Sequence, residues 1–307
     1  MPNNITLASK MTTELDKLFV QSAVTGFMTD NAMRAKFVGA HTVLVPEMAL
    51  GGLDTYKRST GFAEGAINVS NTSYTLSQDR GRSFMLDAQD EDESGVANLA
   101  GQVLGEFVRT RVVPEVDAYC LSKLAGVAKV KSHAIGIGES AFADLRSLIS
   151  KVRDAVGHDE ALVAFLNSER YDELMAAPEI ARYIRIDDFK KGEINTQIRY
   201  IDNVAILPVP SSRMKTKYDF LDSSNTETVN GFSEFADGFK PAGDAENIGM
   251  LVLPKKVPML IRKTEKLRTF TPDQNQKADA YKFDYRLYYD LLVKKSGEDA
   301  IYASIYA

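Results

Sequence analysis

The chain has 307 residues, of which 44% are hydrophobic and 26% charged, enough to bury the core of one large domain or two medium ones. A net charge of −5 argues against a protein whose main task is to grip nucleic-acid phosphates, and a single cysteine, Cys120, excludes an intramolecular disulfide framework. No apolar run approaches the roughly 18 residues of a membrane-spanning helix, and we expect no signal peptide.

The first fifty residues predict short elements. Apolar positions within 12–38 indicate a short helix or loose segment followed by an amphipathic piece. Residues 41–48 (HTVLVPEM) predict a short strand with Pro46 at its end.

A long polar arm follows at 54–83. Ile67 and Val69, then Tyr74 and Leu76, alternate with small polar residues, which is the period of a strand. The residues 71–73 between them favour a turn, so the arm is predicted to be a hairpin. It has only six large apolar residues, namely Tyr56, Phe62, Ile67, Val69, Tyr74 and Leu76.

The arm cannot supply its own core. Ordering its thirty residues costs on the order of 30 kcal/mol of backbone entropy, and roughly 1,200 Å² of apolar burial would be needed to offset that cost. We therefore expect the arm to lie on the rest of the protein or on another copy, which is typical of an assembly subunit.

An acidic cluster and a helix come next. Ser94 is a good N-cap, and Val96, Leu99, Val103 and Phe107 recur at helical steps, so 94–113 is predicted to be an amphipathic helix. Pro114 is expected to end or kink it before a second helix.

The rest of the chain alternates strands and helices, which suggests an α/β region. We expect a helix from about residue 142 to Gly157, a strand at 161–166, and a hairpin of 193–201 with 204–209. Residues 221–247 read as a long surface loop. Further strands are predicted at 248–253, 257–261, 280–293 and 300–306.

The sequence contains no convincing catalytic, cofactor or metal site. His41, His133 and His158 have no metal-ligand spacing, and Cys120 falls in a helical run where a small buried hydrophobe is expected. The glycines at 136 and 138 do not complete a phosphate-binding motif.

One charge pattern gives a hypothesis for contacts between subunits. In a ring of copies, a basic arm could dock over an acidic neighbour; the alternative is two separately solvated faces. The basic residues are Lys57, Arg58, Arg80 and Arg82, and the acidic residues are Asp87, Asp90, Glu91, Asp92 and Glu93.

In order and spacing, several segments resemble the major capsid protein of tailed bacteriophages, whose fold is shared with encapsulins and the herpesvirus capsid floor. These segments are DRGRSFMLDAQDEDES at 79–94, VVPEVDAY at 112–119, GEINTQIRYIDNVAILPVPSSRMKT at 192–216 and PDQNQKADAYKFDYRLYYDLLV at 272–293. With the arm they span most of the chain.

The resemblance implies an α+β phage major capsid fold with an extended β-hairpin arm, a long spine helix in a peripheral domain, and an α/β axial domain. The implied parts are an N-terminal arm at 1–48, an extended loop at 49–87, a peripheral domain at 88–114 and 266–307, and an axial domain at 115–265.

The resemblance also implies a function. The chain would be a structural protein, not an enzyme, that forms pentamers and hexamers of an icosahedral head around double-stranded DNA, assembled in the host cytoplasm. A separate scaffolding protein, a portal and non-specific contact with DNA would be its partners, with no membrane and no cofactor. The alternatives are an encapsulin-like compartment shell and, in another class, a soluble α/β enzyme with an unrecognised site.

Overall fold

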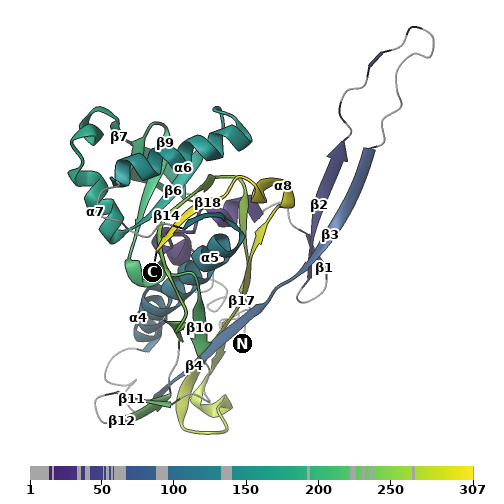
Figure 1. Ribbon diagram of the computed structural model, residues 1–307. Helices are drawn as coiled ribbons and strands as arrows, with labels where there is room; N and C mark the ends of the chain where they lie inside the picture. The colour runs from purple at the N-terminus through teal and green to yellow at the C-terminus, as the bar shows by residue number, and fades with distance from the viewer. Residues whose placement is uncertain are drawn as a thin grey trace.

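A computed structural model describes residues 14–15, 17–32, 36–38, 42–50, 52, 55–56, 58, 67–87, 96–132, 140–191, 194–221, 226–229, 232–235, 238–264 and 267–306. Within these residues, two large sheets and a long helix make up a body, and a narrow β-ribbon projects from it (Figure 1). No helix in the described part is long and apolar enough to cross a membrane.

The larger sheet has seven strands in the order β5-β18-β14-β6-β9-β8-β7. Its centre, β6, is buried on both faces: Val163 and Phe165 belong to one apolar cluster, and Leu162, Ala164 and Leu166 to another. The strands are β5 (Lys129–Ser132), β6 (Leu162–Asn167), β7 (Ile184–Lys191), β8 (Ile194–Ile201), β9 (Val204–Val209), β14 (Asn247–Pro254) and β18 (Tyr302–Tyr306).

Helices cover this sheet. On one face lie α6 (Ala141–Val156) and α7 (Ser168–Ala176), followed by a 3₁₀ turn at Pro178–Arg182. The predicted end of α6 is confirmed, since Gly157 caps it with a φ of +89° that favours glycine. The N-cap of α7 is Asn167 rather than Ser168, because the Asn167 side chain accepts the N–H of Arg170.

The hairpin of β8 and β9 is confirmed. Its two turn residues, Asp202 and Asn203, have φ values of +50° and +63°, which are typical of the tight turn that suits paired strands. Asp and Asn tolerate this conformation better than most residues do.

The long helix is continuous where the sequence predicted an end or kink. It comprises α4 (Val96–Phe107), a π-helical turn (Val108–Val112) and α5 (Val113–Val127). Pro114 lacks a backbone N–H, and the wider turn just before it accommodates that loss without ending the helix.

The second sheet is built around the 14-residue strand β17 (Ala280–Val293). β15 (Pro258–Thr264) and β16 (Arg268–Phe270) pair with one edge of β17, and β4 (Gln78–Asp87) pairs with the other. The last six residues of the predicted arm, 78–83, therefore belong to the body.

The projecting ribbon consists of β1 (Lys36–Val38), β2 (Thr42–Leu50) and β3 (Ile67–Thr75), in the order β1-β2-β3 (Figure 1). The predicted turn at 71–73 is wrong, because β3 runs unbroken through it and pairs with β2. Pro46 lies inside β2 rather than at its end. Small polar residues suit an exposed strand as well as a turn, which explains the error.

The N-terminal residues contribute to the core. Leu15, Phe19, Phe27 and Met28 are buried in the cluster that also contains the long helix. The short helix α2 (Met28–Asn31) docks on the loop before β15, where the Asn31 amide donates to two backbone carbonyls. This part of the predicted N-terminal arm is thus integral to the body.

Two late segments differ from expectation. Residues 221–247 do not form a loop: they contain β11 (Thr226–Val229) and β12 (Phe232–Phe235), and β13 (Gly238–Pro241) pairs with β10 (Tyr218–Leu221). The predicted strands at 280–293 and 300–306 are confirmed, but β18 joins the seven-stranded sheet instead of accompanying β17. The remaining short helices are Ser211–Arg213, Pro272–Gln274 and α8 (Lys295–Glu298).

Candidate assembly interface

The ribbon β1-β2-β3, called the arm from here on, is anchored on the body at its base. Val43 and Val45 of β2 are buried at 0% and 4% exposure, in an apolar cluster with residues of β15 and β17. At Pro46 the strand becomes exposed, and in β3 only Thr72 and Tyr74 of residues 70–75 are partly covered. The arm therefore presents a mainly polar surface beyond its base.

Two large apolar side chains of β1 are exposed. Phe37 and Val38 are 45% and 52% exposed, and Tyr56, in the part between β2 and β3, is 56% exposed. Burying side chains of this size against a partner would contribute about 1.5–3 kcal/mol each at most. Phe37 and Val38 give the arm apolar contact points outside the stretch that the sequence predicted as the arm.

The predicted basic residues fall in different places. Arg82 is exposed on β4, which belongs to the body, and Arg58 is exposed between β2 and β3. Lys57 lies outside the described residues. Of the five acids, Asp87 is exposed at the end of β4, and the other four, Asp90, Glu91, Asp92 and Glu93, also lie outside the described residues. The pairing between these groups stays a prediction.

Arg80 is engaged within its own subunit. Its Nε donates to Oε1 of Glu115 at 2.8 Å, and its terminal nitrogens donate to the carbonyls of Leu221 and Gly238 at 2.8 and 3.0 Å. Its guanidinium also lies 5.9 Å from the ring of Phe220. Arg80 thus fastens β4 to α5 and to the base of the β10–β13 hairpin, and its contact with another subunit stays a prediction.

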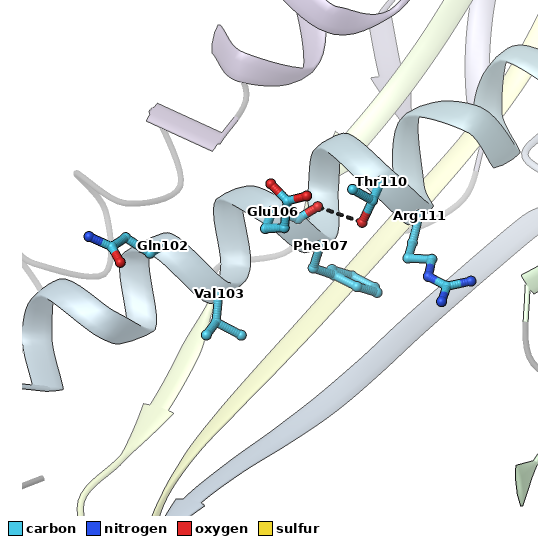
Figure 2. Close-up of a pocket in the computed structure, with 6 residues that line it drawn as sticks. All are labelled: Gln102, Val103, Glu106, Phe107, Thr110 and Arg111. Atoms are coloured by element: carbon cyan, nitrogen blue, oxygen red, sulfur yellow. Dashed lines mark hydrogen bonds between the residues drawn. The ribbon is translucent and has the colours of Figure 1, made fainter. Parts of the chain in front are cut away.

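A shallow hollow lies along the long helix (Figure 2). Its apolar part consists of Val103, which is 42% exposed, and Phe107. The ring of Phe107 packs edge-on against the ring of Phe84, with the two centroids 4.9 Å apart. Helical spacing placed Val103 and Phe107 on the apolar side of the predicted amphipathic helix, and within the described residues Val103 is exposed. The hollow is lined by Gln102, Val103, Glu106, Phe107, Thr110 and Arg111.

A buried carboxylate that the sequence did not signal joins the N-terminal segment to the long helix. Asp117 accepts the backbone N–H of Val24 and of Thr25 at 3.1 and 3.0 Å, and the Thr25 hydroxyl at 2.6 Å. Nη1 of Arg213 lies 3.3 Å from Oδ2 of Asp117. Burial raises the pKa of Asp117, and the hydrogen bonds and the nearby guanidinium partly oppose that rise.

The structure offers no evident catalytic constellation in the described part. Cys120 is fully buried, as predicted, and burial raises the pKa of its thiol well above the ordinary value, which makes it a poor nucleophile. His158 is exposed, and His41 and His133 lie outside the described residues. No group of three or more metal-ligating side chains occurs among the residues described.

No family model matches the chain, and no curated protein matches its sequence. Solved structures do match it. A capsid structure of cyanophage P-SCSP1u aligns with a TM-score of 0.55 over 89% of this chain and 85% of that chain, at 12% identity. The mature capsid of bacteriophage PhiM1 gives 0.53 over 87% and 82%, at 12% identity. The chain has the fold of phage capsid proteins.

This capsid fold confirms the α+β class predicted from the sequence. A structure of Mycobacterium phage Che8 also aligns, with a TM-score of 0.51 over 86% of this chain and 84% of that chain, at 12% identity. The match thus extends over most of each chain.

Proposed function

We propose that this protein is the major capsid subunit of a tailed bacteriophage, which assembles into the icosahedral head that encloses double-stranded DNA. The observation that carries the proposal is the capsid fold, matched over 86–89% of the chain in three phage structures. The projecting arm supports it. Its few apolar side chains cannot form a core within the arm, so they would be buried only against a neighbour.

Assembly would rest on many repeated contacts. Identical subunits joined head to tail around a rotation axis form closed rings, and pentamers and hexamers are the rings that an icosahedral shell requires. Each arm would lie on an adjacent subunit and bury its apolar contact points, such as Phe37 and Val38. The resulting protein would be located in the virion and, during assembly, in the host cytoplasm.

The contacts between charges would set the register. Arg58 and Arg82, together with Lys57, would approach the acidic segment that begins at Asp87 and includes Asp90, Glu91, Asp92 and Glu93 of a neighbour. Exposed pairs contribute only about 0–1 kcal/mol each, so they would select the position of the arm more than they would add affinity.

Further partners follow from the same proposal. A separate scaffolding protein would guide curvature, a portal would replace one pentamer, and packaged DNA would touch the inner surface without sequence preference. The role would be structural rather than catalytic, with the arm and the 49–87 loop region serving assembly and residues 115–265 forming most of the axial domain.

Negative-stain electron microscopy of the purified protein, together with sedimentation velocity, tests the proposal. We expect closed shells or rings of five and six subunits. A compact monomer at all concentrations would overturn it. Shells purified from cells that hold protein cargo and no DNA would instead favour a compartment shell, the encapsulin-like alternative.

A further inference from the structure

At its C-terminal end, the arm passes into the body through two residues. β3 ends at Thr75 and β4 begins at Gln78, so the chain passes from the arm sheet into the β17 sheet at Leu76 and Ser77. Neither residue belongs to a strand. Contacts that hold these two residues therefore bear on the direction in which β3 leaves the body.

Leu76 is held by apolar contacts. It is 7% exposed and packs in the cluster at the arm base, with Val43 and Val45 of β2. The rest of this cluster comes from the body, where Met259 and Ile261 belong to β15 and Tyr288 and Leu292 to β17.

Ser77 is held by a carboxylate instead of a backbone carbonyl. The ladder between β4 and β17 ends with Gln78 opposite Tyr289, so the next position on β17 is Asp290. There, Oδ2 of the Asp290 side chain accepts the backbone N–H of Ser77 at 3.2 Å. The carboxylate thus ends the ladder and still satisfies the N–H of the chain that turns away into the arm.

The carboxylate itself is fixed by three other donors. Its Oδ1 accepts the hydroxyl of Tyr119 at 2.8 Å, the ammonium of Lys123 at 2.5 Å and the N–H of Leu291 at 2.7 Å. The Asp290 side chain is 4% exposed. A buried carboxylate with this many donors resists displacement, because moving it would leave a charge unpaired.

The Ser77 side chain closes the network. Its hydroxyl lies 2.9 Å from the hydroxyl of Tyr119, which itself is bonded to Asp290. We call Ser77, Tyr119, Lys123 and Asp290 the arm-base network. Desolvation opposes the charge on Lys123, but the hydrogen bond and negative charge of Asp290 raise its pKa overall, so the ammonium stays protonated.

We propose that the arm-base network is a positioning device that fixes the direction of the arm within a single subunit, before any neighbour is present. The apolar cluster holds the chain at Leu76 and the network holds it at Ser77, one residue later. Two successive residues held by different kinds of contact, apolar packing and hydrogen bonds, leave little freedom for rotation. The arm is therefore already oriented when subunits meet, which lowers the entropy lost on contact.

Spin labels can test this on the unassembled subunit. Cysteines introduced as Ser70→Cys on β3 and Ser211→Cys on the body, both exposed positions, report the distance between arm and body by double electron–electron resonance. The native Cys120 is buried and unreactive, so it can remain. Measurements at concentrations below assembly keep the test independent of the proposed function.

The variants separate the network from general stability. Asp290→Ala removes the acceptor, and Tyr119→Phe removes one hydroxyl while preserving the ring, so it is expected to fold even if the first variant does not. Asp79→Asn is the matched control. Asp79 lies on β4, two residues after Ser77, and the substitution breaks its exposed ion pair with Arg286 of β17.

We expect one narrow distance distribution in the parent and in Asp79→Asn, and a distribution about two-fold broader in Asp290→Ala and Tyr119→Phe. A parent distribution that is already as broad as in the variants would overturn the proposal. So would an unchanged width in folded Tyr119→Phe, because the hydroxyl that joins the Ser77 side chain to Asp290 would then contribute nothing to the direction of the arm.

Discussion

Two strands of this protein, β6 and β3, show how differently its parts are held. All six residues of β6 are buried, and they contribute to apolar clusters on both faces of the seven-stranded sheet. In β3, the described side chains from Ser70 to Thr75 are exposed or partly covered. The body is therefore stable through its own core, whereas the described part of β3 buries little apolar surface within the subunit.

This contrast predicts where substitutions act. A change in the body should alter the free energy of unfolding of the single subunit. A change in the arm beyond Pro46 should leave that free energy nearly unchanged and alter association instead. Residues at the junction should show intermediate effects, because they belong to both.

The largest effect on stability is expected in the centre of the body. Phe165 is fully buried and stacks on Phe27 with ring centroids 6.2 Å apart. Phe165→Ala should lower the free energy of unfolding by about 3–5 kcal/mol, measured by urea denaturation of the unassembled subunit. The exposed arm residue Ser70 provides a control, and an equal loss in Ser70→Ala would contradict the contrast.

Asp117→Asn should lower the free energy of unfolding by about 1–3 kcal/mol near neutral pH. The NH2 group that replaces one carboxylate oxygen cannot accept a hydrogen bond from the backbone N–H groups of Val24 and Thr25. Burial raises the pKa of Asp117 in the folded protein. Between its ordinary pKa, about 4, and the raised value, the unfolded chain is ionised and the folded protein holds the proton.

The contribution of Asp117 to stability is therefore largest below about pH 4 and declines as the pH rises through that window. Asp117→Asn has no carboxyl group at this position, so its stability lacks this dependence on pH. Chemical denaturation at several pH values should show the advantage of the parent over Asp117→Asn shrinking with rising pH. An advantage that grows over the same range would mean that the hydrogen bonds and Arg213 outweigh burial.

Arg80→Ala should reduce the free energy of unfolding by about 1–3 kcal/mol, because it leaves Glu115, whose side chain is 13% exposed, without its cation and frees two carbonyls. Arg82→Ala on the same strand is the matched control, since Arg82 is exposed. Thermal unfolding of both variants distinguishes an arginine that stabilises its own subunit, Arg80, from an arginine exposed on its surface, Arg82. The sequence alone could not separate these two roles.

The sequence predicted much of the body but misplaced the arm. The helix ending at Gly157, the hairpin turning at Asp202 and the aromatic strand at 280–293 carry strong local signals, and the structure confirms them. Buried strands and capped helices have patterns that follow from their own contacts. The capsid fold was also recognisable from the order of its segments.

The arm was misread because the pairing of its strands depends on distant residues. β3 pairs with β2 across the ends of a long connection, and β4 pairs with β17, about 200 positions later in the chain. Small polar residues in β3 suit an exposed strand and a turn equally. The roles of Arg80, Asp117 and Asp290 were invisible for the same reason, since their partners lie far away in sequence.

The smallest effect on the subunit is expected from the charges proposed for the interface. Arg58→Glu and Arg82→Glu should each change the free energy of unfolding by about 0.5 kcal/mol or less. Assembly should weaken and its dependence on salt should change, as light scattering at several ionic strengths would reveal. Unaltered assembly in both variants would remove these residues from the interface.

The most direct test of the account is to shorten the arm and follow assembly by electron microscopy. Pro46 lies opposite Asn71, so an Asn-Gly turn in place of residues 47–70 closes the ribbon above its apolar base. The account predicts a folded subunit with nearly the parent's thermal midpoint that forms no closed shells under conditions where the parent does. Normal shells built from the shortened subunit would contradict it.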